Sequence, residues 1–183
     1  MNDYISTPLI LERLRVERDA LVARVEGIPA DLRDRRPGPN RWSIAEVLEH
    51  LTRVEIGVTK LLTLRGQDAP PPGSATPDDL NLFTPAIANL IRDRSKRIEA
   101  PERVQPVGAL SAQAALAHLK TTRAGMLAAF LSANVDALDQ LTHPHPAFGP
   151  LSLRSWVALA ADHEARHAEQ IGEIAEQLRA QHS

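Results

Sequence analysis

The sequence predicts an all-α protein, a four-helix bundle with one long crossover between its second and third helices. Apolar residues recur every three or four positions in four long segments, as they do on one face of a helix. Of the 183 residues, 43% are hydrophobic but only 3% are aromatic, which is typical of helix packing rather than of a β-sandwich. A stretch rich in proline and glycine separates the second segment from the third.

The bulk composition excludes several classes of function. The length predicts a single domain over residues 1–183. A net charge of −2 gives no reason to expect a nucleic-acid partner. The absence of cysteine excludes disulfides, thiolate metal sites and a cysteine nucleophile, and leaves imidazole and carboxylate as metal ligands. No signal peptide and no apolar run of about 20 residues is visible, so we expect a cytoplasmic protein without a membrane partner.

The first two helices lie in the N-terminal third. Apolar periodicity predicts the first helix over about residues 7–25, and the charged, proline-broken stretch 33–40 is expected to be a connection. The second helix has the clearest start signal, because Ser43 and Glu46 form a capping-box pattern in which each side chain satisfies the other's backbone amide. This helix should continue to about Leu64.

The connection and the third helix follow. Three consecutive prolines make Gly66–Asp79 unsuited to helix or strand. We expect one irregular helix within Leu80–Arg97, around Ile87, Leu90 and Ile91, and the third bundle helix over Ser111–Ser132. The stretch Asn134–Pro150 contains His-Pro-His-Pro and Phe-Gly-Pro, and is predicted to be a loop.

The last helix, capped by Ser152, carries the most informative pattern. Its apolar seam has spacings of three and four residues, and its members are Trp156, Ala160, His163, His167, Ile171, Ile174 and Leu178. His163 and His167 occupy seam positions where a bundle normally places leucine. Histidines four apart lie on one helix face, so the two imidazoles can bind one divalent ion.

A shared cation would also satisfy two buried imidazoles, each of which otherwise loses about 1–3 kcal/mol if a ring nitrogen lacks a partner. His50, on the inward flank of the second helix, is the candidate third ligand. It lies about 21 Å from the far end of its helix, while His163 and His167 lie about 15 and 21 Å from the start of theirs, so antiparallel neighbours bring the levels together. The simpler interpretation is that all three are ordinary histidines, partly buried or exposed, with carbonyl or carboxylate partners.

Other polar residues near the pair are candidates for accessory roles. Gln170 falls on the same stripe and could orient a ligand or simply cap the core. His145 lies in the proline-stiffened loop and could act as an acid or base at the mouth of a site, or serve only loop structure. Arg166 could pair with Asp162 or Glu169 along the helix, or hold a substrate carboxylate.

His163, Glu164 and His167 also satisfy H-E-x-x-H, the zinc-peptidase pattern in which the glutamate activates water. No strand signal is present that could hold an extended peptide substrate. The pattern is short, with two free positions, and arises by chance on charged helices. We therefore expect Glu164 to be a solvated or ion-paired carboxylate.

Three motifs in order resemble the DinB/YfiT-like superfamily: Trp42 to Leu51, His145 to Gly149, and His163-x-x-Arg-His167-x-x-Gln170. The resemblance covers most of the chain and is weakest over 66–107. It implies a four-helix bundle, frequent homodimers, and a divalent metal such as zinc or nickel held by three histidines, which correspond here to His50, His163 and His167. Characterised relatives include thiol-dependent S-transferases and isomerases.

The expected function is therefore that of a divalent-metal-dependent enzyme acting on a small electrophilic molecule. A thiol-dependent S-transferase, or a related hydrolase or isomerase, is the expected type, with a low-molecular-weight thiol as candidate cofactor. The alternative is a non-enzymatic bundle, with a structural metal or none, that acts through its dimer surface.

Overall fold

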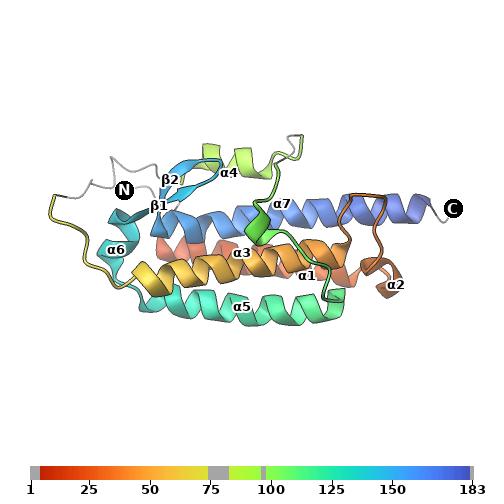
Figure 1. The fold of residues 1–183 in the computed structure, drawn as a ribbon, viewed down its shortest axis with the longest axis horizontal. Helices are drawn as coiled ribbons and strands as arrows, with labels where there is room; N and C mark the ends of the chain where they lie inside the picture. The colour runs from red at the N-terminus through yellow and green to blue at the C-terminus, as the bar shows by residue number, and fades with distance from the viewer. Residues whose placement is uncertain (1–4, 74–82, 96–97, 182–183) are drawn as a thin grey trace.

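Four long helices pack side by side in the computed structural model, which describes residues 5–73, 83–95 and 98–181 (Figure 1). They are α1 (Thr7–Glu26), α3 (Ile44–Arg65), α5 (Ala112–Ser132) and α7 (Leu153–Ala180). The predicted four-helix bundle is confirmed, and the predicted helix boundaries agree with the observed ones to within a few residues.

The directions of the helices explain the long crossover. In Figure 1, α1 and α7 run one way along the bundle, and α3 and α5 run the other way. The chain leaving α3 must therefore return along the whole length of this 22-residue helix, about 33 Å, before α5 can begin. The returning segment contains α4 (Pro85–Arg92), which packs on α7, and the short 3-10 helix η3 (Glu102–Val104), which packs on α3.

Local capping signals set where the bundle helices begin. Ser43 and Glu46 form the predicted capping box: the Glu46 amide donates to Ser43 Oγ at 3.2 Å, and the Ser43 amide donates to Glu46 Oε2 at 2.8 Å. Ser111 and Ser152 accept from backbone amides in the same way at the starts of α5 and α7. These caps satisfy amides that the first helical turn leaves without partners.

The prediction that Asn134–Pro150 is a loop is wrong. The stretch contains α6 (Val135–Gln140) and β1 (Thr142–His145), which pairs antiparallel with β2 (Gly149–Ser152). Pro144 lies opposite Pro150 in this hairpin. Because neither proline has an N–H group, the two can face each other only at a non-hydrogen-bonded position of the ladder, where no bond is lost. A second short helix, α2 (Ala30–Arg33), was also not predicted.

The crossover differs in part from its prediction. Residues 66–73 form neither helix nor strand, as expected, while the rest of Gly66–Asp79 lies outside the described residues. The irregular helix expected within Leu80–Arg97 is the shorter α4, and residues 80–82 and 96–97 are not described. Within α4, Ile91 is buried and Leu90 is 41% exposed.

A polar layer at mid-bundle divides the apolar core into two clusters. One cluster lies toward the hairpin and contains Val58, Met126 and Trp156; the other lies toward α2 and contains Leu21, Leu51 and Ile171. Between them all four bundle helices place buried or partly buried polar side chains: Arg18, His50, Glu55, Arg123, His163, Glu164 and His167. No helix among the described residues is long and apolar enough to cross a membrane.

Candidate metal centre

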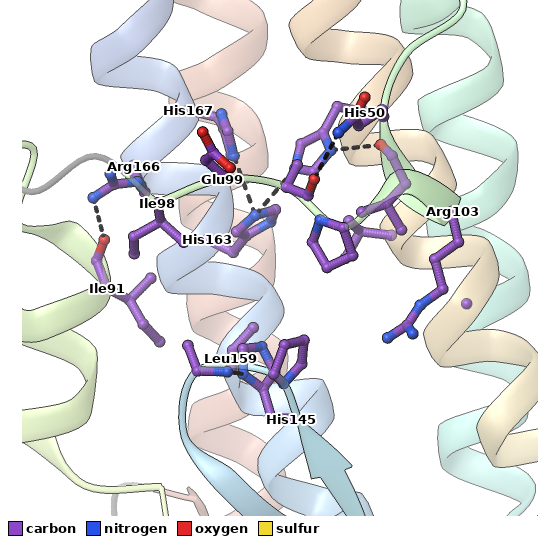
Figure 2. Close-up of a pocket in the computed structure, with 18 of the residues that line it drawn as sticks. His50, Ile91, Ile98, Glu99, Arg103, His145, Leu159, His163, Arg166 and His167 are labelled. Carbon is purple, nitrogen blue, oxygen red and sulfur yellow. Dashed lines mark hydrogen bonds between the residues drawn. The ribbon is translucent and has the colours of Figure 1, made fainter.

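Three histidines from two antiparallel helices converge in the polar layer (Figure 2). His50 comes from α3, and His163 and His167 come from α7. His163 Nε2 lies 3.3 Å from His50 Nε2 and 3.1 Å from His167 Nε2. In a tetrahedral site with metal–nitrogen distances of 2.0–2.1 Å, two ligand nitrogens are separated by about 3.3 Å. The spacing of the three imidazoles therefore fits a single divalent ion.

Hydrogen bonds on the opposite ring nitrogens orient two of these imidazoles. His50 Nδ1 donates to the carbonyl oxygen of Val104 at 2.8 Å, and His167 Nδ1 lies 2.8 Å from Gln170 Oε1. An oxygen acceptor requires the proton on Nδ1, so Nε2 of each neutral ring presents a lone pair toward His163. A proton on His163 Nε2 can satisfy only one of these two lone pairs, whereas a cation satisfies all three nitrogens. Metal-binding histidines commonly have such outer partners.

Burial keeps the three rings in the neutral form that ligates metals. Desolvation lowers the pKa of His50, despite the opposing hydrogen bond to Val104. Desolvation lowers the pKa of His163 and of His167 well below the ordinary value, and the neighbouring imidazoles and Arg166 add to the effect in both. The lowered pKa values reduce the competition of protons with a cation for these nitrogens.

The cluster faces a pocket of about 970 Å³. Its walls come from α3, α7, the hairpin and the crossover, whose residues from Ile91 to Gln105 contribute to the lining. The crossover therefore covers the histidines, and Val104 in η3 also supplies the acceptor for His50. The proline-rich residues 70–72 do not line the pocket, so the cover is built by α4, η3 and the segment between them rather than by that stretch.

A model of the DinB superfamily matches residues 13–171. The chain belongs to the DinB superfamily. It is 27% identical over 155 residues to YuaE of Bacillus subtilis (strain 168), described as uncharacterized, with 84% of this chain and 90% of YuaE covered. The crystal structure of TT2238, described as a four-helix bundle protein, covers 90% of this chain and 96% of its own, with a TM-score of 0.58 and 24% identity. This likeness supports the bundle fold.

Both predicted accessory residues of this DinB-superfamily chain line the pocket. Gln170 bonds His167, as described above. The His145 ring stacks on Phe148 with centroids 4.7 Å apart, and lies 4.9 Å from the ring of Trp156. Trp156 Nε1 donates to the His143 carbonyl oxygen at 3.1 Å and so ties the hairpin to α7. The hairpin therefore fixes His145 at the pocket wall, which sequence reasoning could not show because it predicted a loop.

Arg166 attaches the crossover to α7 beside the histidines. Its Nη1 donates to the carbonyl oxygens of Ile91 at 2.9 Å and Asp93 at 2.5 Å, at the end of α4. Asp162, which was considered as its partner along the helix, accepts a bond from Arg92 Nε at 2.6 Å and so anchors the same segment. Arg166 thus holds a pocket wall in place.

Glu164 does not face the pocket. It is 1% exposed and forms ion pairs with Arg18 and with Arg123, whose Nη2 lies 2.7 Å from Glu164 Oε2. Arg18 and Arg123 also bind Glu55, so the four charges join all four bundle helices. The ion-paired carboxylate predicted for Glu164 is confirmed. A glutamate held in this way cannot activate a water molecule at the histidines, which argues against the peptidase interpretation.

Proposed function

We propose that this protein is a divalent-metal-dependent enzyme, a thiol-dependent S-transferase or a related hydrolase or isomerase, that acts on a small electrophilic molecule. One observation carries the proposal: three neutral imidazoles converge through Nε2 on a common point at the wall of a large pocket. The family resemblance adds the thiol dependence.

His50, His163 and His167 would hold the ion, zinc, nickel or one of similar preference for imidazole. Bound there, it supplies Lewis acidity that lowers the pKa of a coordinated thiol or water. Val104 and Gln170 keep the ligand nitrogens aimed at the ion, because each accepts the proton on the opposite side of its ring.

The surroundings of the cluster favour a reactive site over a structural one. Structural zinc sites are closed by four protein ligands, whereas catalytic sites keep a position open for water or substrate. Among the described residues, three histidines form the cluster, and the pocket lies in front of them. Phe148, Trp156 and Leu159 give the pocket apolar walls that can hold the body of an organic substrate and exclude water.

In the S-transferase reaction, the thiol sulfur forms a bond to an electrophilic carbon of the substrate. A leaving group such as chloride departs with the electron pair of the broken bond, and the thiol proton passes to solvent. The protein's part is to hold the two reactants in line within the pocket. The alternative, a non-enzymatic bundle with a structural metal that acts through a dimer surface, does not explain a pocket that opens on the ligands.

Metal analysis of protein purified without a histidine tag tests the first part of the proposal. After incubation with Zn²⁺ or Ni²⁺ and removal of excess ion, we expect one ion per chain. His50→Ala should lose most of the metal while keeping its helical circular dichroism. The matched control is His118→Ala, which removes an exposed histidine of α5. Full metal stoichiometry in the His50 variant would contradict the ligand set.

A screen of low-molecular-weight thiols with a chlorinated aromatic electrophile tests the chemistry. The metal-loaded protein should release chloride and form the thioether only when a thiol is present. Loss of turnover in His50→Ala and its retention in His118→Ala would assign the reaction to the cluster. Metal binding without thiol-dependent turnover across the screen would refute the transferase and favour hydrolysis or the non-enzymatic alternative.

A further inference from the structure

The hairpin end of the pocket contains a histidine whose tautomer the backbone determines. The Ala147 amide donates a hydrogen bond to His145 Nδ1 at 3.1 Å. Nδ1 is therefore the lone-pair nitrogen of this ring, and the single proton of the neutral imidazole must be on Nε2. Burial, together with the charge of Arg103, lowers the pKa of His145 to about 4, so the ring stays neutral at pH 7. His145 thus offers an N–H donor rather than a base.

The ring cannot easily turn to change this role. It is stacked on Phe148 and packed against Trp156, and Trp156 itself is bonded to the hairpin backbone. Among the described residues, none accepts a hydrogen bond from His145 Nε2. His145 is only partly buried and lines the pocket, so this N–H is free to bind an acceptor on a ligand there.

Arg103 brings a positive charge to the hairpin end of the pocket. It projects from η3, lines the pocket, and extends toward the end that holds His145 (Figure 2). The charge of Arg103 also contributes to the lowered pKa of His145. No carboxylate of the described residues forms an ion pair with Arg103, whereas Arg94 in the same lining is paired with Glu173 at 2.6 Å. Arg103 is therefore available to a ligand.

The net charge of the residues that line the pocket also favours an anionic ligand. The described residues of the pocket wall include Arg41, Arg94, Arg103 and Arg166 but only one carboxylate, Glu99. Because Glu173 pairs with Arg94, the excess that remains is Arg41, Arg103 and Arg166 over Glu99, and a pocket with this excess attracts anions. An N–H donor beside a guanidinium is an arrangement that binds a carboxylate through charge-assisted hydrogen bonds.

The distance between the three histidines and the hairpin end of the pocket, where His145 lies, sets the length of the ligand. His145 packs on Trp156, which precedes His163 by seven residues of α7, or about 10 Å along the helix. We infer that the pocket binds an anionic thiol, with its sulfur toward the three histidines and a carboxylate bound by Arg103 and the Nε2–H of His145. This inference rests on the proposed function and names the class of thiol that it uses.

A matched pair of thiols tests it. The cobalt-loaded full chain is titrated with 6-mercaptohexanoate and with 6-mercaptohexan-1-ol, which have six-carbon chains and differ in the charge of the far end. Binding is followed by the sulfur-to-cobalt charge-transfer absorption. We expect the acid to bind more tightly than the alcohol, by about tenfold for one charge-assisted bond.

Three variants assign the preference. Arg103→Gln and His145→Phe, which keeps the stacking but removes the N–H, should each weaken binding of the acid and leave that of the alcohol unchanged. Arg15→Gln removes an exposed charge on α1, outside the pocket lining, and should keep the wild-type preference. Equal affinity for the two thiols, or a preference that survives both pocket substitutions, would overturn the inference.

Failure of the proposed function would look different. Absence of the charge-transfer band with both thiols would refute thiol binding at the cluster, and the inference with it, whereas equal affinities refute the inference alone. A further titration adds hexanoate to the 2-mercaptoethanol complex. If hexanoate binds beside the short thiol and the six-carbon acid has no advantage, the anionic group belongs to the second reactant, and the assignment to the thiol is wrong.

Discussion

Glu164→Gln distinguishes the two roles that the H-E-x-x-H pattern allows for this residue. In the structure, the Glu164 carboxylate is buried against Arg18 and Arg123, whose side chains are 14% and 9% exposed. The network contains two arginines and two glutamates, so its charges balance. Replacing Glu164 with glutamine leaves one positive charge without a counter-charge inside the bundle.

The burial of the Glu164 ion pairs sets the expected loss of stability. Removing one partner of a buried ion pair costs about 3–5 kcal/mol, and we expect the free energy of unfolding to fall by that amount. A domain with about 10 kcal/mol of stability, the middle of the usual range, keeps about half of it, so the variant should remain folded at room temperature. Urea unfolding of the metal-loaded protein, followed by circular dichroism, measures the difference.

Glu169→Gln is the matched control. It makes the same substitution on the same helix, in an ion pair with Arg24 whose side chains are 60% and 40% exposed. Exposed pairs contribute about 0–1 kcal/mol, so this variant should unfold almost like the wild type. The metal stoichiometry of folded Glu164→Gln should stay at the wild-type value. A Glu164 variant with wild-type stability but abolished hydrolytic turnover would refute the structural role and restore the peptidase interpretation.

Two further predictions concern the histidines. Gln170→Leu removes the hydrogen-bond acceptor of His167 Nδ1 and should weaken zinc binding about 10- to 100-fold, as measured by competition with a chelator. The control is Gln177→Leu, at an exposed position of the same helix, which should leave zinc binding unchanged. Equal zinc affinities of the two variants would rule out the orienting role of Gln170. Burial lowers the pKa of His50, His163 and His167 in the folded protein. In the metal-free protein just below pH 6.5, the ordinary pKa of histidine, only the unfolded chain therefore binds protons at these rings. The free energy of unfolding should fall as the pH drops through 6.5, by up to about 1.4 kcal/mol per pH unit for each ring. Urea unfolding at pH 7.5, 6.5 and 5.5 in chelator checks this, and a flat profile would show that the rings titrate normally.

The bundle could be predicted because its signals are local. Each long helix has its own apolar stripe, and a capping box marks the start of α3, so no knowledge of neighbouring helices is required. The two α7 histidines were found in the same way, as polar residues on an apolar seam. The hairpin was missed because its prolines lack N–H groups and resemble a loop, although at non-hydrogen-bonded positions they lose nothing.

The buried charge network was not predicted, although the sequence contains a signal for it. Arg18 lies between Leu14 and Leu21 at spacings of four and three, and Arg123 lies between Leu119 and Met126 in the same way. Glu55 likewise interrupts the stripe of Leu51 and Val58. None of the three was singled out from the sequence, because one helix read alone shows no partner for a charge. Only the packing of four helices brings the opposite charges together at one level.

The parallel arrangement of α3 and α5 explains why the site has walls. With antiparallel neighbours joined by short loops, His50, His163 and His167 would lie on an open face of the bundle. Because α5 runs in the same direction as α3, the chain must cross the bundle between them, and it crosses over the face that carries the three histidines. The crossing supplies Val104 to orient a ligand and Arg103 to attract an anion. The topology thus accounts both for the pocket and for the chemistry of its walls, while the bundle helices account for the metal ligands.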